Sequence, residues 1–118
     1  MTDRYAQVAL PLPLAEPYRY RIPATLADRA LPGARVVVPV RREELIGIVT
    51  AVDVAPPPTA ARDILAAPDD EVALPAPLLA LAARAARYYG APPGLMLRAM
   101  LPAALWGQST VMLHLEAA

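Results

Sequence analysis

The sequence predicts a mainly β fold with some α: a small, partly closed β-barrel followed by one longer and one shorter helix. β-Branched residues dominate two apolar runs within 34–53, which a short charged turn separates, so this stretch is expected to form a hairpin. Both runs are apolar at nearly every position, which is typical of strands covered on both faces. Apolar residues recur at helical spacing after residue 75, which predicts that helices follow the barrel.

Length and composition favour one soluble domain. The chain has 118 residues, and we expect a barrel part at about 4–67, a helical part at about 75–101 and a C-terminal tail at 102–118. We also expect these parts to form the N-terminal fragment of a longer protein. The chain has no Cys, which excludes disulfides and Cys-ligated zinc. Its apolar stretches are interrupted well before the roughly 18 residues of a membrane span, so we expect a cytoplasmic protein that does not enter membranes.

The hairpin has two distinct arms. Valines fill the first arm at 36–40, and aliphatic residues fill the second at 45–52, after the turn 41–44 with the sequence RREE. Gly47 lies inside the second arm, where a missing side chain indicates a bulge or a close backbone approach. Pro39 has no amide hydrogen and is therefore expected at an edge or a bulge.

Three further strands are predicted, at 5–10, 18–22 and 61–66. A polar connection at 25–31, with a helical turn, precedes the hairpin. In the strand at 18–22, alternation assigns three residues to one face, Tyr18, Tyr20 and Ile22, and two to the other, Arg19 and Arg21.

The longer helix is predicted to begin at Pro77 and to end before Gly90. Its apolar residues at helical spacing are expected to face the core: Leu78, Leu81, Ala82, Ala85, Tyr88 and Tyr89. Arg84 and Arg87 fall on the opposite side. The shorter helix is predicted at 93–100, and the tail at 108–116 alternates weakly, as a strand would.

No enzyme motif is present, so we expect neither catalytic residues nor metal or cofactor sites. The glycines are too scattered for a phosphate loop or a dinucleotide-binding fingerprint. The one histidine, His114, lies in an apolar tail and is expected to be structural. The adjacent acids Asp69, Asp70 and Glu71 lie in a proline-flanked connector and are interpreted as a solvated loop.

Aromatic and arginine residues make DNA binding one candidate function. Tyr18 and Tyr20 could stack on bases, while Arg19, Arg21, Arg41, Arg42 and Arg62 could contact phosphates. The opposing interpretation is that tyrosines at alternate positions fill a barrel wall and that exposed arginines face solvent. Zero net charge argues against a strongly basic nucleic-acid binder, although not against a local arginine patch.

Several segments in order resemble the N-terminal, 3′-end DNA-binding domain of the PriA family of primosomal replication-restart helicases. The matching pieces lie at 8–14, 18–20, 32–39, 46–49 and 86–89. The resemblance covers about 5–101, nearly all of the chain. It implies an OB-like β domain, not itself an enzyme, that holds the 3′ end of the nascent leading strand at a stalled fork for a separate ATP-driven helicase motor. The implied partners are fork or single-stranded DNA, the helicase domains of the same chain, and other primosome or single-strand-binding proteins.

The resemblance also implies an end-binding pocket at Tyr18, Arg19, Arg41 and Arg62, where the family has an aromatic, an acid, a glycine and a lysine. Arg19 and Arg41 depart from that pattern. A carboxylate accepts hydrogen bonds whereas a guanidinium only donates them, so weakened selectivity for 3′ ends is expected. Together with Tyr20 and Arg42, these residues form the predicted DNA-binding set. The rival function is a protein-interaction module of a replication complex with little direct DNA binding.

Overall fold

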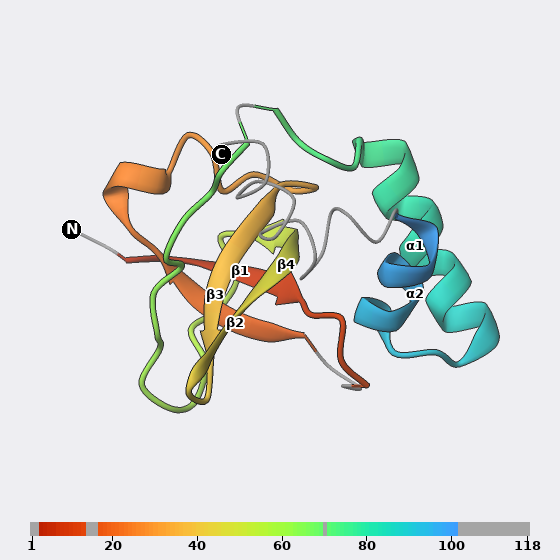
Figure 1. Cartoon of the computed structure of the whole chain (residues 1–118), viewed down its shortest axis with the longest axis horizontal. Helices are drawn as coiled ribbons and strands as arrows, with labels where there is room; N and C mark the ends of the chain where they lie inside the picture. Colours follow the sequence, from red (N-terminus) through yellow and green to blue (C-terminus); the bar gives the residue numbers. More distant parts are fainter. Residues whose placement is uncertain (1–2, 14–16, 70, 102–118) are drawn as a thin grey trace, which may run out of the picture.

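The computed structural model describes residues 3–13, 17–69 and 71–101 and shows a barrel beside a pair of helices (Figure 1). Four strands form one antiparallel sheet in the order β2-β1-β4-β3. Their bounds are β1 Arg4–Ala9, β2 Tyr18–Ile22, β3 Arg35–Val40 and β4 Glu43–Val52, and the short 3-10 helix η1 spans Ala24–Leu26. The predicted hairpin is therefore present. The strand predicted at 108–116 lies outside the described residues, as do His114 and Asp70.

The segment 62–66 closes the barrel between the sheet edges β2 and β3. Arg21 exchanges backbone hydrogen bonds with this segment, since its amide donates to the Arg62 carbonyl at 2.9 Å and its carbonyl accepts from the Ile64 amide at 3.0 Å. On the other side, the Val37 amide donates to the Ala66 carbonyl at 2.8 Å. The prediction of a strand at 61–66 is wrong, because the segment makes only isolated bridges, Arg21 with Asp63 and Val37 with Ala66. It switches from one edge to the other and so never builds a ladder along either.

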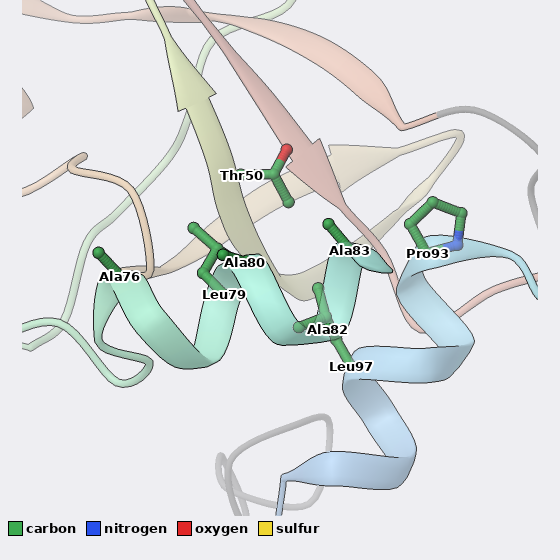
Figure 2. A pocket seen from close by; sticks show the side chains of 8 residues that line it. All are labelled: Thr50, Ala76, Leu79, Ala80, Ala82, Ala83, Pro93 and Leu97. Carbon is green, nitrogen blue, oxygen red and sulfur yellow. The ribbon is translucent and has the colours of Figure 1, made fainter. Parts of the chain in front are cut away.

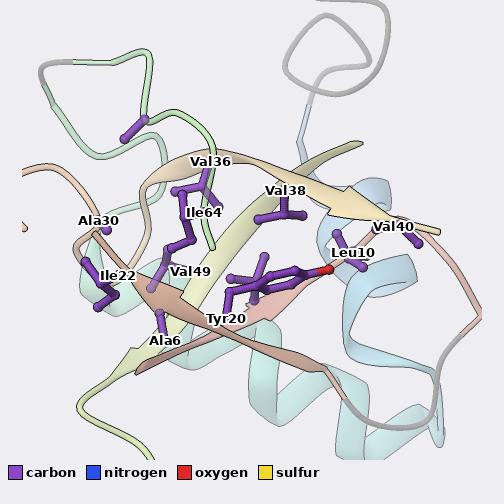
Figure 3. Close-up of a cluster of buried hydrophobic side chains, with 12 residues drawn as sticks. Ala6, Leu10, Tyr20, Ile22, Ala30, Val36, Val38, Val40, Val49 and Ile64 are labelled. Carbon is purple, nitrogen blue, oxygen red and sulfur yellow. The ribbon is translucent and has the colours of Figure 1, made fainter. Parts of the chain in front are cut away.

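The barrel interior is filled by aliphatic side chains and one tyrosine (Figure 3). Val8, Val36, Val38 and Val49 have no exposed surface in this cluster. Gly47 is a site of close backbone approach, as predicted, because a Cβ there would lie 2.9 Å from the Ala9 carbonyl oxygen and 2.5 Å from Val8 Cγ1. The missing side chain of Gly47 therefore lets β4 pack closely against β1.

Two helices cover the outer face of the sheet: α1, Ala76–Tyr89, and α2, Pro93–Met100. Both were predicted, and Gly90 ends α1 in the left-handed conformation with φ of 65°. A second buried cluster joins them to the sheet: Ala9, Ile48, Leu74, Ala82 and Leu97. In β4, Val49 therefore faces the barrel interior and Ile48 faces the helices, which explains the continuous apolar run. The chain has the predicted mainly β fold, an OB-like half-barrel followed by two helices.

The prediction that the largest apolar residues of α1 face the core is wrong. Tyr88 and Tyr89 are 83% and 73% exposed, and Leu78 and Leu81 are exposed as well. The helix instead packs through Ala82 and Ala86, which are buried. Apolar residues surround most of this helix, so spacing alone does not select the buried face, and the alanines allow the closest approach to the sheet.

Among the described residues, no helix is both long enough and apolar enough to span a membrane.

Candidate nucleic-acid interface

A pocket of about 250 Å³ opens where the start of β2 meets the β3–β4 turn. Five of the six predicted DNA-binding residues line it: Tyr18, Arg19, Tyr20, Arg41 and Arg62. The sixth, Arg42, is exposed in the turn and is not among the lining residues. Folding thus brings together side chains that are more than forty positions apart in the sequence.

The two tyrosines of β2 occupy different environments. Tyr18 is 41% exposed at the pocket mouth, whereas Tyr20 is 3% exposed and its hydroxyl donates a hydrogen bond to the Pro39 carbonyl oxygen at 2.9 Å. Figure 3 shows the Tyr20 ring among the core side chains. Burial raises the pKa of Tyr20 to about 12, with the nearby Tyr18 phenol adding to the rise and Arg62 opposing it. Tyr18 therefore offers a ring for stacking, while Tyr20 supports the pocket wall.

Arg19 holds a proline-rich segment at the edge of the pocket. Its Nη1 donates to the carbonyl oxygens of Ala55 and Pro56 at 3.4 and 3.3 Å. Residues 57, 59 and 60 of the following segment also line the pocket. None of these residues is in the predicted DNA-binding set. The sequence does contain an indication of this segment, because the run of prolines at 56–58 lies shortly before Arg62, which is in that set.

Arg41 and Arg62 meet at the β3–β4 turn. The Nη2 of Arg62 donates to the Arg41 carbonyl oxygen at 3.1 Å. Arg41 has φ of 57°, the left-handed region that favours glycine. This is the position where the resemblance implies a glycine. Within the described part of the chain, the Arg41 side chain has no hydrogen-bond or ion-pair partner, and its guanidinium is exposed to solvent.

The remaining arginine of β2 is committed to an acid. Arg21 binds Asp63 through two contacts of 2.6 and 2.8 Å, and Asp3 lies 3.8 Å away. Hydrogen bonding by Arg21 lowers the pKa of Asp63. Arg21 therefore ties β2 to the closing segment and does not line the pocket.

The described residues that line this pocket include three arginines, Arg19, Arg41 and Arg62, and no carboxylate, so we call it the arginine-lined pocket. Such a surface can donate hydrogen bonds to phosphate oxygens and to base acceptors, while Tyr18 provides an aromatic face. Within the described ranges, no cluster of three or more His, Cys, Asp or Glu side chains could hold a metal ion.

A second pocket, of about 310 Å³, lies between the helices and β4 (Figure 2). Small apolar residues line it, and Thr50 is its one polar side chain. The Thr50 hydroxyl lies 3.2 Å from the Gln7 carbonyl oxygen and donates to it. This pocket offers no charged group to a phosphate, so the arginine-lined pocket is the better candidate for nucleic acid.

The family comparison agrees with this geometry. The model of the PriA family described as 3′DNA-binding domain (3′BD) matches residues 7–102, which span the sheet and both helices. DNA is therefore the partner class of this domain. The match covers most of the 118 residues, and the chain belongs to the PriA 3′DNA-binding domain family.

Proposed function

We propose that this domain binds fork or single-stranded DNA at the 3′ end of the nascent leading strand during replication restart. The observation that carries the proposal is the convergence of Tyr18, Arg19, Arg41 and Arg62 on one pocket. Membership of the 3′DNA-binding domain family supports it. The domain acts as a binding module. Its proposed partners are the helicase domains of the same chain and other primosome or single-strand-binding proteins. Its proposed location is the cytoplasm.

In the bound state, Tyr18 stacks on a base near the terminus, which suits any of the four bases because each has a π face. The exposed guanidinium of Arg41 binds a backbone phosphate. Arg62 donates to the Arg41 carbonyl and has further N–H groups free for the strand. Arg42 adds charge beside the pocket without lining it.

Selectivity for a free 3′-hydroxyl is proposed to be weak. A terminal hydroxyl is best recognised by an acceptor, and a carboxylate is the strongest acceptor among side chains. The described lining residues include no carboxylate, and Arg19 stands where the family has an acid. A pocket lined by hydrogen-bond donors is expected to accept an additional phosphate at the 3′ terminus as well.

The test compares fork DNA bearing a 3′-hydroxyl on the leading strand with the same fork bearing a 3′-phosphate. Fluorescence anisotropy is expected to give dissociation constants within about threefold of each other, a difference under 1 kcal/mol. The matched variant Arg19→Asp/Arg41→Gly restores an acid and a glycine and is expected to prefer the hydroxyl. A loss of more than about tenfold with the 3′-phosphate on the unmodified domain would contradict weak selectivity.

Salt dependence provides a separate measure of phosphate contacts. Each phosphate neutralised is expected to add about 0.7 to 0.9 to the slope of log affinity against log salt. Arg41→Gln removes one phosphate contact and should therefore reduce that slope by about 0.7 to 0.9.

A protein-interaction module is the second candidate function. The exposed apolar residues of α1 and the zero net charge favour it. Titration with labelled fork, single-stranded and duplex DNA at low salt separates the two functions, because an interaction module binds none of them.

A further inference from the structure

The end of α1 exposes two large aromatic side chains side by side. Tyr88 and Tyr89 are 83% and 73% exposed, and their ring centroids lie 4.9 Å apart at an interplanar angle of 83°. This edge-to-face arrangement is a favourable geometry for aromatic pairs. The pair adds nothing to either buried cluster, so its presence on the surface is not explained by folding.

The surroundings of the tyrosine pair are positively charged. The two helices contain three arginines, Arg84, Arg87 and Arg98, and no Asp or Glu. Arg84 is four positions before Tyr88, so both lie on one exposed face of α1 and not on opposite sides as predicted, with Arg87 one turn after Arg84. Within the described residues, neither Arg84 nor Arg87 has an ion-pair or hydrogen-bond partner. Exposed aromatic rings beside uncommitted arginines are typical of surfaces that bind single-stranded nucleic acid.

A separate hollow lies between the start of β2 and the end of α1. It has a volume of about 410 Å³, and its lining includes Pro17 from the β2 side and Arg87 and Gly90 from the end of α1. Pro17 directly precedes Tyr18, which lines the arginine-lined pocket, and consecutive Cα atoms are about 3.8 Å apart. One end of the hollow is therefore next to the arginine-lined pocket, and Arg87 lies on the lining of the hollow, so the shortest path for a strand that runs from Tyr18 over Pro17 leads toward Arg87.

We propose that Arg84, Arg87, Tyr88 and Tyr89 form a second DNA contact, which holds single-stranded nucleotides 5′ to the terminus bound at Tyr18. The charge and the exposed rings fit a polyanion with stackable bases better than an apolar protein partner. This inference rests on the proposed function, since the strand is the one whose end occupies the arginine-lined pocket. It predicts that affinity grows with strand length beyond the pocket.

The experiment measures binding of 5′-labelled oligothymidines of about 3 and about 12 nucleotides to the 118-residue chain. Tyr88→Ala/Tyr89→Ala is expected to weaken binding of the longer strand on the order of tenfold, and to leave the shorter one unchanged. Leu81→Ala, an exposed apolar residue of the same helix, is the matched control and should change neither. Arg87→Gln should lower the salt slope for the longer strand by about 0.7.

Unchanged affinity of the double variant for the longer strand, relative to Leu81→Ala, overturns the second contact and would assign the tyrosines to a protein partner. Equal losses for both strands also overturn it, because they indicate damage to the pocket or the fold. In either case a loss for Tyr18→Ala keeps the proposed function intact. Absence of binding by the unmodified chain to both strands overturns the proposed function itself.

Discussion

At the scale of single residues, the arginines differ in what their guanidinium groups contact. Three bind carboxylates through paired contacts of 2.6 to 3.2 Å: Arg4, Arg21 and Arg35. Arg19 and Arg62 donate to backbone carbonyls around the pocket. Arg41 and Arg42 have no side-chain partner among the described residues. Of these seven arginines, only Arg41 and Arg42 have their full donor capacity available, which a count of charges does not reveal.

Arg41→Gly is expected to stabilise the fold. An L-residue in the left-handed region costs roughly 1 to 2 kcal/mol, and the glycine would be free of that penalty. Part of the gain is offset by the larger backbone entropy of glycine in the unfolded chain, so a net increase of about 0.5 to 1 kcal/mol is expected in the free energy of unfolding by urea. Arg42→Gly is the matched control. Arg42 is not at positive φ, so glycine there should destabilise, and stabilisation by both variants would contradict the argument.

Tyr18→Ala is expected to cost about 1 to 3 kcal/mol of DNA-binding free energy, because the variant loses a stacking face. Tyr18→Phe keeps the ring and should retain the affinity for single-stranded DNA in an anisotropy titration. An alanine variant that is folded and binds as tightly as the unmodified domain would assign Tyr18 to the barrel wall alone.

Tyr20 links stability to alkaline pH. Because burial raises its pKa to about 12, the unfolded chain loses this proton near the ordinary value of 10.0 while the folded chain retains it. The stabilisation is fully present below pH 10.0 and is lost as the pH rises through about 12. An ultraviolet titration should show a phenol that ionises late, and Tyr20→Phe should remove that step. Persistence of the late step in the phenylalanine variant would assign it to another tyrosine.

Alternation predicted that Tyr18 and Tyr20 share a face, but it did not distinguish the ring at the pocket mouth from the ring in the core. That difference depends on the Pro39 carbonyl and the closing segment, which lie far away in the sequence. Residue chemistry suggested the tyrosines and arginines as candidates, Arg21 included, and the resemblance singled out Tyr18, Arg19, Arg41 and Arg62 among them. Their convergence in one pocket is a product of tertiary structure, which the pattern of residues does not contain.

At the scale of elements, α2 depends on a glycine for its position. A Cβ at Gly94 would overlap the carbonyl oxygen of Leu10, just beyond β1. Gly94→Ala must therefore push α2 away from the sheet, and because the overlap is with backbone we expect a loss of about 3 kcal/mol in the free energy of unfolding. Gly90→Ala is the control, since its Cβ meets no atom within 4 Å and only the positive φ opposes it, at a cost of about 1 kcal/mol. Equal losses for the two variants would contradict the close approach.

The strands and helices with strong local signals were predicted well. β-Branched runs gave the hairpin, and Pro77 with Gly90 bounded α1 to within one residue. The failures share one cause. The segment 61–66 has strand-like residues but alternates between two partners, and the buried face of α1 is selected by a line of alanines rather than by its largest side chains. Both outcomes depend on what lies opposite, which local sequence does not specify.

At the scale of the molecule, an ion pair fastens the connector between barrel and helices. Arg35 in β3 is 8% exposed and binds Asp69 through two contacts of 2.7 and 2.8 Å. Hydrogen bonding by Arg35 lowers the pKa of Asp69, against the opposing effect of partial burial. The contribution to stability is therefore present above the ordinary carboxyl pKa of 3.8 and is lost as the pH falls through the lower folded value.

Asp69→Asn is accordingly expected to cost about 2 kcal/mol near pH 7, because the buried Arg35 guanidinium loses its two contacts with the Asp69 carboxylate. The variant should also lose less stability than the unmodified domain when the pH falls below 3.8. Urea unfolding at neutral and acidic pH measures both effects. Asp53→Asn is the control, since Asp53 pairs with Arg4 at the exposed surface and should cost less than about 1 kcal/mol. Equal losses in both variants would contradict the role of burial.

The closing segment 62–66 gives the barrel a seam with one bridged residue pair on each side, where the ladders have four to six. Such weakly paired regions open locally at a lower free energy than global unfolding requires. Arg62 lies on this seam and in the arginine-lined pocket at once. Under the proposed function, the DNA-binding pocket is complete only when the seam is closed. Bound DNA therefore stabilises the closed seam by mass action. Substitutions that loosen the seam therefore weaken DNA binding without contacting DNA, and bound DNA slows amide exchange on the β2 side of the barrel.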